Sequence, residues 1–271
     1  MPDTGLARHL DRLRSSGPPF FSDMSVSEAL GTPPETFRAD IADLVDAGDA
    51  VCPHQGFYVL AKDGRPGLDA DPTRWLQGFM AFLGIRYRVS LLSAAAHFYG
   101  ASHQAIMCTQ AIVPTDVKDI RTGYATVLFL RQKPRMFAKV NGEPWVVRRR
   151  NGLVAASPEL TIFDLVDFAR SHPSETWHIG QTVKDMGDMA RPDRLRELAR
   201  CFLVPVVRRL GYLLDHAGLK PQADALIDFI RPGARHVRLN PRVKEIPGLR
   251  QNYELDEKWG IVLNDHLEYD I

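Results

Sequence analysis

Cysteine is scarce in this chain, and long hydrophobic runs are absent. The 271 residues include three cysteines, Cys52, Cys108 and Cys201, which lie far apart in the sequence. They form no metal-ligand pair, and their odd, scattered number is typical of a reducing compartment, which predicts a cytoplasmic protein. No apolar stretch approaches the roughly 20 residues of a membrane span, and the N-terminus lacks the apolar core of a signal peptide.

The common motifs of enzyme active sites are also missing. The chain has no G-x-x-x-x-G-K-[ST] loop, no G-x-G-x-x-G fingerprint, no H-E-x-x-H motif and no G-x-S-x-G elbow. Ser102-His103-Gln104 fits a polar cap between two elements better than a nucleophile pair. Asp265, Glu268 and Asp270 could bind Mg²⁺ as a carboxylate cluster, although a terminal acidic segment is more often solvated. We therefore expect no catalytic residues, no metal and no cofactor.

Charge of one sign is not in excess. The chain has 34 basic and 33 acidic residues, a net charge of +1, which gives no global attraction to nucleic acid or membrane. Hydrophobic residues make up 45% and charged residues 25%, which is ordinary for a globular protein. The length predicts one large or two modest domains. The polar segment 62–67, with its Gly and Pro residues, is the expected linker, so we predict domains at 1–66 and 70–271.

Residues 20–60 carry the most informative pattern. A short helix is expected at Ser25–Leu30, a break at Gly31-Thr32-Pro33, and a longer helix at Pro34–Ala47. Two short aromatic strands then flank the turn Pro53–Gly56. The order of helix, turn, helix and strand pair is that of a winged helix-turn-helix DNA-binding module.

The longer helix has start and end signals in the sequence. Thr32 can cap its N-terminus, with Glu35 three residues later as in a capping box. Gly48 suits the left-handed conformation that often ends a helix. The apolar stripe at helical spacing is formed by Phe37, Ile41, Leu44 and Val45. An opening helix would complete a three-helix core with Leu6, Leu10 and Leu13.

Exposed residues at the start of a recognition helix read base edges in the major groove. Here they would be Thr36, Arg38 and Ala39, of which only Arg38 suits guanine. At the wing tip, His54 and Gln55 are the expected contacts. Residues 1–67 hold six basic and ten acidic residues, a net charge of −4, so this module alone should bind DNA weakly. The alternative is a three-helix module that packs against protein or dimerises.

Positive charge is concentrated in residues 121–150, which hold eight basic residues against Glu143 alone, a net charge of +7. Much of it falls on a predicted hairpin of Met136–Val140 and Trp145–Arg150 around Asn141-Gly142. Two interpretations remain open, a solvated sheet face and a phosphate-contacting surface that offsets the acidic N-terminal module. The phosphate-contacting residues would be Arg131, Lys133, Arg135, Lys139, Arg148, Arg149 and Arg150.

Beyond residue 70 the pattern mixes helices and strands. Helices are expected at 72–83, 87–99, 157–171, 179–189, 192–217 and 220–229, and further strands at 105–113, 126–131 and 259–264. The sequence thus predicts an α+β protein, with an N-terminal winged helix-turn-helix followed by a larger mixed α/β C-terminal domain.

Four further segments follow the N-terminal module in a fixed order. They are YRVSLLSAAAHFYGASHQ (87–104), SPELTIFDLVDF (157–168), RRLGYLLDHAGL (208–219) and WGIVLNDHLEYD (259–270). Each is moderately specific alone, but their order and spacing resemble the AbiEi family of antitoxins, from type IV toxin–antitoxin (abortive infection) systems. The resemblance covers nearly the whole chain. These C-terminal motifs are mostly apolar or capping residues, so they read as fold determinants rather than catalytic groups.

The resemblance implies a non-catalytic antitoxin, active in phage defence, that also represses its own operon. Its winged helix would bind inverted repeats in the promoter, with Pro34–Ala47 as recognition helix and Pro53–Gly56 as wing turn. Its larger domain would counter a co-encoded nucleotidyltransferase-like toxin of the AbiEii type, without need of a stable complex. The alternatives are a stand-alone winged-helix transcriptional regulator and a nucleic-acid-processing enzyme that the winged helix targets.

Overall fold

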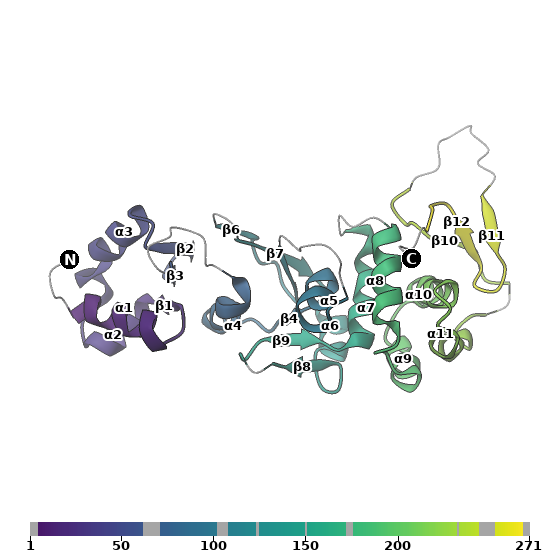
Figure 1. Cartoon of the computed structure of the whole chain (residues 1–271), viewed down its shortest axis with the longest axis horizontal. Helices are drawn as coiled ribbons and strands as arrows, with labels where there is room; N and C mark the ends of the chain where they lie inside the picture. Colours follow the sequence, from purple (N-terminus) through teal and green to yellow (C-terminus); the bar gives the residue numbers. More distant parts are fainter. Residues whose placement is uncertain are drawn as a thin grey trace. The chain divides into compact units, whose positions relative to one another are not determined.

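The computed structural model describes residues 5–61, 71–101, 108–122, 125–149, 151–171, 176–231, 233–243 and 253–267 (Figure 1). Its helices are α1 (Gly5–Ser16), α2 (Asp23–Leu30), α3 (Arg38–Asp46), α4 (Pro72–Phe82), α5 (Leu91–Tyr99), α6 (Pro134–Val140), α7 (Pro158–Asp167), α8 (Thr176–Gly187), α9 (Pro192–Ala199), α10 (Val204–His216) and α11 (Lys220–Ile227), with 3₁₀ turns η1 (Pro34–Thr36) and η2 (Phe168–Arg170).

The strands belong to three sheets. They are β1 (Phe20–Ser22), β2 (Ala50–His54), β3 (Phe57–Leu60), β4 (Arg88–Val89), β5 (Thr109–Val113), β6 (Ile120–Thr122), β7 (Ala125–Arg131), β8 (Val146–Arg148), β9 (Val154–Ala156), β10 (Val237–Arg238), β11 (Glu254–Asp256) and β12 (Ile261–Leu263). The sheet orders are β1-β3-β2, β6-β7-β5-β4-β9-β8 and β10-β12-β11. This mixture of helices and sheets confirms the expected α+β class.

The chain divides into two compact units. Unit 1 comprises residues 1–88, 107–132 and 148–154, and unit 2 comprises residues 89–106, 133–147 and 155–271. The predicted linker, 62–67, lies outside the described residues.

Unit 1 begins with α1, β1, α2, η1, α3, β2 and β3, the N-terminal module. Strand β3 pairs antiparallel with both β1 and β2. Ser22 caps α2 through a reciprocal capping box with Ser25, and Gly31 ends that helix at φ +65°. The three helices and the sheet enclose one apolar core of Leu6, Leu10, Phe21, Val26, Phe37, Ile41, Leu44, Ala50 and Leu60. The predicted three-helix core and its apolar stripe are therefore present.

The start of the longer helix differs from the prediction. Thr32 does not cap it; instead Pro33 precedes the 3₁₀ turn η1 without a side-chain hydrogen bond. Phe37, at φ −123° and ψ 2°, interrupts the helix, and α3 begins at Arg38. Phe37 is buried, so its place in the core sets this break. Gly48 adopts φ +77°, as predicted for the residue that follows the helix.

The remainder of unit 1 places α4 beside the three strands β5, β6 and β7. Asp71 caps α4, and Trp75, Leu76 and Phe79 form its buried face. Strand β7 pairs parallel with β5 and antiparallel with β6. The buried guanidinium of Arg88 donates to Gln132 Oε1 at 3.0 Å, which satisfies a polar group within this core.

Unit 2 is mainly helical, with α7 at its centre. Eight residues of α7, 159–166, are buried. Ser90 Oγ, at the start of α5, donates to the buried Asp164 carboxylate of α7 at 2.7 Å. Leu91, the next residue, has φ +60°, the only positive φ among described non-glycine residues. The C-terminal strands β10, β12 and β11 form the small sheet of this unit.

Several predicted elements have other bounds or another type. The predicted strand Met136–Val140 is wrong: these residues lie in helix α6, which begins at Pro134 and buries Phe137 and Val140 at helical spacing. Of the predicted hairpin, only β8 is a strand. The predicted helix 192–217 is two helices, α9 and α10, and the predicted helix 87–99 begins as the short strand β4.

Candidate nucleic-acid interface

The three predicted base-reading residues lie at the junction of η1 and α3. Arg38 is the first residue of α3, and Arg38 and Ala39 are exposed. Within the described ranges, the Arg38 guanidinium makes no hydrogen bond or ion pair. Thr36 is exposed too, but its hydroxyl donates to the Pro33 carbonyl oxygen at 2.6 Å. Thr36 Oγ1 can therefore act towards a base only as a hydrogen-bond acceptor. On the opposite side of α3, Ile41 and Leu44 fix the helix on the core.

The exposed side of α3 is otherwise acidic. Glu35 lies in η1, and three aspartates follow on α3, all of them exposed: Asp40, Asp43 and Asp46. Arg38 is the only basic residue between 32 and 61. A helix with this charge repels phosphate along most of its length and attracts it only at its first turn.

The predicted wing is the hairpin of β2 and β3, in which His54 pairs with Phe57. His54 and Gln55 are exposed at its tip. His54 Nδ1 lies 2.9 Å from the Gln55 carbonyl oxygen, and the ring centroid lies 6.2 Å from Phe79 and 5.9 Å from Phe82 of α4. One side of the His54 ring is thus packed on α4, whereas a free wing would present both sides to solvent.

The seven predicted phosphate-contacting residues are divided between the two units. In unit 1, Arg131 and Arg148 are exposed and Arg149 is half-buried. Arg131 pairs with Asp116 at 2.9 Å, which reduces its field. Asp116 lies fifteen residues before Arg131 and outside the basic stretch 121–150, so the charge pattern of that stretch does not reveal the pair.

In unit 2, Lys133, Arg135 and Lys139 are exposed on α6 and at its start. Arg135 and Lys139 are four residues apart on this helix, so they share one side of it. Arg150 lies outside the described residues. The described members of this set therefore fall in both units.

The predicted metal and nucleophile alternatives find no support among the described residues. These hold no group of three or more His, Cys, Asp or Glu arranged to bind a metal ion. Asp265 Oδ2 accepts a hydrogen bond from Asn240 Nδ2 at 2.7 Å. Glu268, Asp270 and residues 102–104 fall outside the described ranges. None of the described helices is long and apolar enough to cross a membrane.

Comparison with known families assigns the central part of the chain. Residues 88–216 match the family described as the AbiEi antitoxin C-terminal domain. This segment is similar to the C-terminal domain of AbiEi antitoxins. The match begins at β4 and ends with α10. It contains the whole of segment 157–168, most of segments 87–104 and 208–219, and none of segment 259–270. The AbiEi resemblance is thereby confirmed, and it supports a role as the antitoxin of a toxin–antitoxin system.

A solved structure supports the fold over nearly the whole length. The crystal structure of the RV2827C protein from Mycobacterium tuberculosis matches with a TM-score of 0.65 and 19% sequence identity, over 94% of this chain and 90% of that chain. At this identity the similarity shows the fold alone. No curated protein gives a significant match.

Proposed function

We propose that this chain is the antitoxin of a type IV toxin–antitoxin system and represses its own operon by binding inverted repeats in the promoter. The match of residues 88–216 to the AbiEi antitoxin C-terminal domain supports the proposed antitoxin role. One arrangement in unit 1 supports the repressor half: α3 rests on a core shared with α1 and α2, precedes the hairpin β2–β3, and exposes Arg38 at its first turn. This is the order of a winged helix-turn-helix.

In this proposal Arg38 is the principal base reader. A guanidinium at the first turn of a recognition helix can donate two hydrogen bonds to guanine O6 and N7. Ala39 would contact a thymine methyl group, and Thr36 would accept from a base amino group because its own hydrogen is engaged. His54 and Gln55 would contact the backbone from the wing.

Phosphate binding would come from outside α3. We assign phosphate binding to basic residues of both units. In unit 1 these are Arg131, Arg148, Arg149 and Arg150, and in unit 2 they are Lys133, Arg135 and Lys139 on α6 and at its start. Because Arg131 is already paired with Asp116, its contribution should be the smallest. Each inverted repeat offers two half-sites, so two copies of the chain would occupy one operator.

The partner of the antitoxin activity would be a co-encoded nucleotidyltransferase-like toxin of the AbiEii type. Neutralisation in such a system does not require a stable complex, and it requires no catalysis or cofactor from this chain. Coexpression with the neighbouring toxin gene tests this half of the proposal. Growth should recover when the full chain is present, and persistent growth arrest would refute the antitoxin role while leaving the repressor role open.

Binding to the DNA upstream of the gene tests the repressor half. The full chain should retard this DNA in preference to a scrambled duplex of the same composition, at roughly 50 mM and 200 mM salt. Equal affinity for both duplexes would refute sequence-selective repression.

The acidic surface of α3 favours one second candidate, a module that binds protein instead of DNA. Its exposed Asp40, Asp43 and Asp46 would suit a basic protein partner. A stable complex with the purified toxin, together with no retardation of any DNA, would support this alternative over the first.

A further inference from the structure

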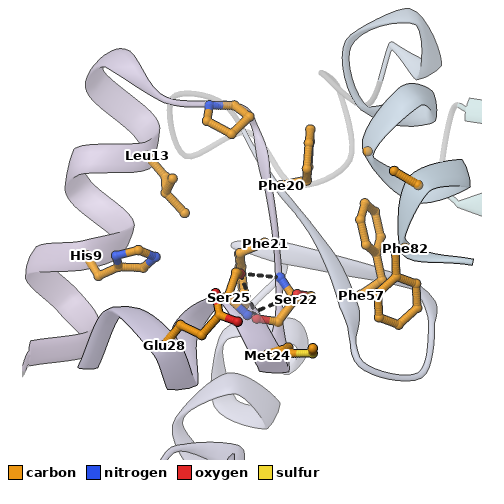
Figure 2. Close-up of a pocket in the computed structure, with 13 residues that line it drawn as sticks. His9, Leu13, Phe20, Phe21, Ser22, Met24, Ser25, Glu28, Phe57 and Phe82 are labelled. Atoms are coloured by element: carbon orange, nitrogen blue, oxygen red, sulfur yellow. Dashed lines mark hydrogen bonds between the residues drawn. The ribbon is translucent and has the colours of Figure 1, made fainter. Parts of the chain in front are cut away.

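An apolar pocket of about 500 Å³ lies in unit 1, between the N-terminal module and α4 (Figure 2). Its volume falls within the range of small-molecule sites. Leu13 of α1, Phe20 and Phe57 of the sheet, Met24 of α2 and Phe82 of α4 contribute its apolar walls. Five elements thus surround one ligand-sized space: α1, β1 and α2, which are consecutive in the chain, together with β3 and α4.

Three aromatic rings pack together at the apolar side of the pocket, with Phe57 buried between Phe20 and Phe82. Phe20 and Phe57 are stacked, with centroids 5.4 Å apart and planes inclined by 24°. Phe57 and Phe82 are 5.5 Å apart at 44°. Met24 is 65% exposed and Phe82 is 41% exposed, which is unusual for such large apolar side chains. A planar ring bound here would stack on the wall and cover both side chains.

The polar groups of the pocket are concentrated where α1 faces α2. Ser22 and Ser25 line it, but they are engaged with each other in the capping box, with N···Oγ distances of 2.9 and 3.1 Å. This leaves His9 and Glu28 to interact with a ligand; Figure 2 shows both on the side of the pocket opposite Phe57 and Phe82.

The lining carries one carboxylate at this polar end. Burial and the nearby Arg12 lower the pKa of His9 from its usual value, which favours the neutral imidazole. Among the described lining residues, Glu28 is the only one with a formal charge. The pocket therefore combines an apolar aromatic wall with a single carboxylate. These two features favour a ligand that has an aromatic ring and a positive charge.

We propose that this pocket binds a small aromatic amine, with its ring against Phe20 and Phe82 and its ammonium group facing Glu28. These rings account for the flat apolar part of the ligand, and the lone carboxylate accounts for its positive charge. His9 adds a hydrogen-bonding group beside the ammonium. Such a ligand would contact α1, α2, β1, β3 and α4 together, so its binding would stabilise unit 1 against unfolding.

Calorimetric titration of the full chain with three matched indoles tests the proposal. Tryptamine, tryptophol and indole-3-propionate share the ring and differ in ending with an ammonium, a hydroxyl or a carboxylate. Tryptamine should bind roughly threefold or more tightly than tryptophol, because a partly exposed ion pair contributes modestly. Indole-3-propionate should bind most weakly of the three.

Two variants and one control locate the site. Glu28→Gln should abolish the preference for tryptamine over tryptophol, whereas Glu35→Gln, an exposed carboxylate outside the pocket lining, should leave it unchanged. Ala81→Phe fills the pocket from an exposed position on α4 and should weaken all three indoles at least tenfold.

Three results would overturn the proposal. The first is no heat of binding from tryptamine at millimolar concentration, and the second is equal affinity for the three indoles. The third is a wild-type dimer that Ala81→Phe converts to a monomer, measured by sedimentation velocity, because a second copy of the chain would then occupy the pocket.

Discussion

The indole ring of Trp259 lies directly on the backbone of Gly211 in α10. A Cβ at residue 211 would come within 1.9 Å of Trp259 Cζ3. Arg208, on the preceding turn, donates through Nε to the Trp259 carbonyl oxygen at 2.6 Å and through Nη2 to that of Gly260 at 2.7 Å. Close packing and two hydrogen bonds to backbone carbonyl oxygens together hold the C-terminal segment on α10.

Gly211→Ala should destabilise the protein. Alanine favours a helix over glycine by about 1 kcal/mol, but overpacking a filled core costs about 1–3 kcal/mol, and here the ring is fully buried and cannot move aside. We expect a net loss of up to about 2 kcal/mol in urea unfolding. Gly142→Ala is the control, because no atom lies within 4 Å of a Cβ there. Equal stability of the two variants would contradict the packing argument.

Asp215→Asn should lower the stability in a pH-dependent way. Burial raises the pKa of Asp215, but hydrogen bonds from Lys258 and Trp259 and the charge of Lys258 outweigh it, so the pKa lies below its usual value of 3.8. Lys258 Nζ lies 2.7 Å and Trp259 Nε1 2.9 Å from Oδ2. The wild-type carboxylate therefore stabilises the fold above pH 3.8, and this contribution is lost as the pH falls through the lowered value.

The measurement is chemical unfolding of wild type and Asp215→Asn between pH 7 and the acid limit of solubility. The variant should be less stable by about 1–2 kcal/mol at pH 7, and the difference should shrink below pH 3.8. Asp228→Asn, which breaks the exposed pair with Arg196, is the matched control and should change stability by less than about 1 kcal/mol. A difference that stays constant with pH would rule out the ionic contribution.

Ser90→Ala should cost about 1–3 kcal/mol, because it removes the hydroxyl that Ser90 donates to the buried carboxylate of Asp164. Ser15→Ala is its control: that hydroxyl also donates, to the Arg12 carbonyl oxygen, but it is exposed and water can replace it. Thermal unfolding of the two variants compares the same chemical change at a buried and an exposed site. Similar transition temperatures would show that the buried hydrogen bond contributes little.

Arg38→Ala should relax base preference. We expect a loss of about 1–3 kcal/mol on the upstream operator and little change on the scrambled duplex, measured by fluorescence anisotropy. Arg14→Ala removes an exposed arginine of α1 that pairs with Asp11, and it should leave the discrimination intact. If Arg38→Ala weakens both duplexes equally, Arg38 contacts phosphate and not a base.

Arg148→Glu should weaken binding to all DNA sequences alike. An exposed arginine that contacts phosphate contributes to the salt dependence, so the slope of log K against log salt should fall by about one. Arg200→Glu makes the same charge change at an exposed position that follows α9. An unchanged slope for Arg148→Glu, or equal slopes for both variants, would remove Arg148 from the proposed interface.

The sequence predicts the elements whose local signals agree with their packing. Phe37, Ile41 and Leu44 are all buried, as their helical spacing indicated. Ser157 caps α7 by accepting from Leu160 N, as the Ser-Pro-Glu pattern indicated. In these cases the spacing of apolar residues and the capping residue act on the same few turns, so local information is sufficient.

Local patterns fail where a distant residue decides the outcome. Residues 136–140 have apolar and basic residues that fit a strand, but Phe137 and Val140 are buried at helical spacing after Pro134. The pairing of Arg131 with Asp116 and the packing of His54 on α4 join segments that are apart in sequence. For the same reason the apolar pocket could not be predicted, because its walls come from five separate elements.

Phe20 and Phe57 of the N-terminal module pack against α4, where Phe57 contacts the Phe79 ring. Gly78 allows the close approach of Phe20, because a Cβ at residue 78 would lie 2.1 Å from the Phe20 ring. A fragment that ends before α4 would expose Phe57, which is now 1% accessible, to water. The N-terminal module therefore depends on α4 to cover its apolar surface. A chimaera that grafts it onto another protein should remain soluble only if residues 72–82 are transferred with it.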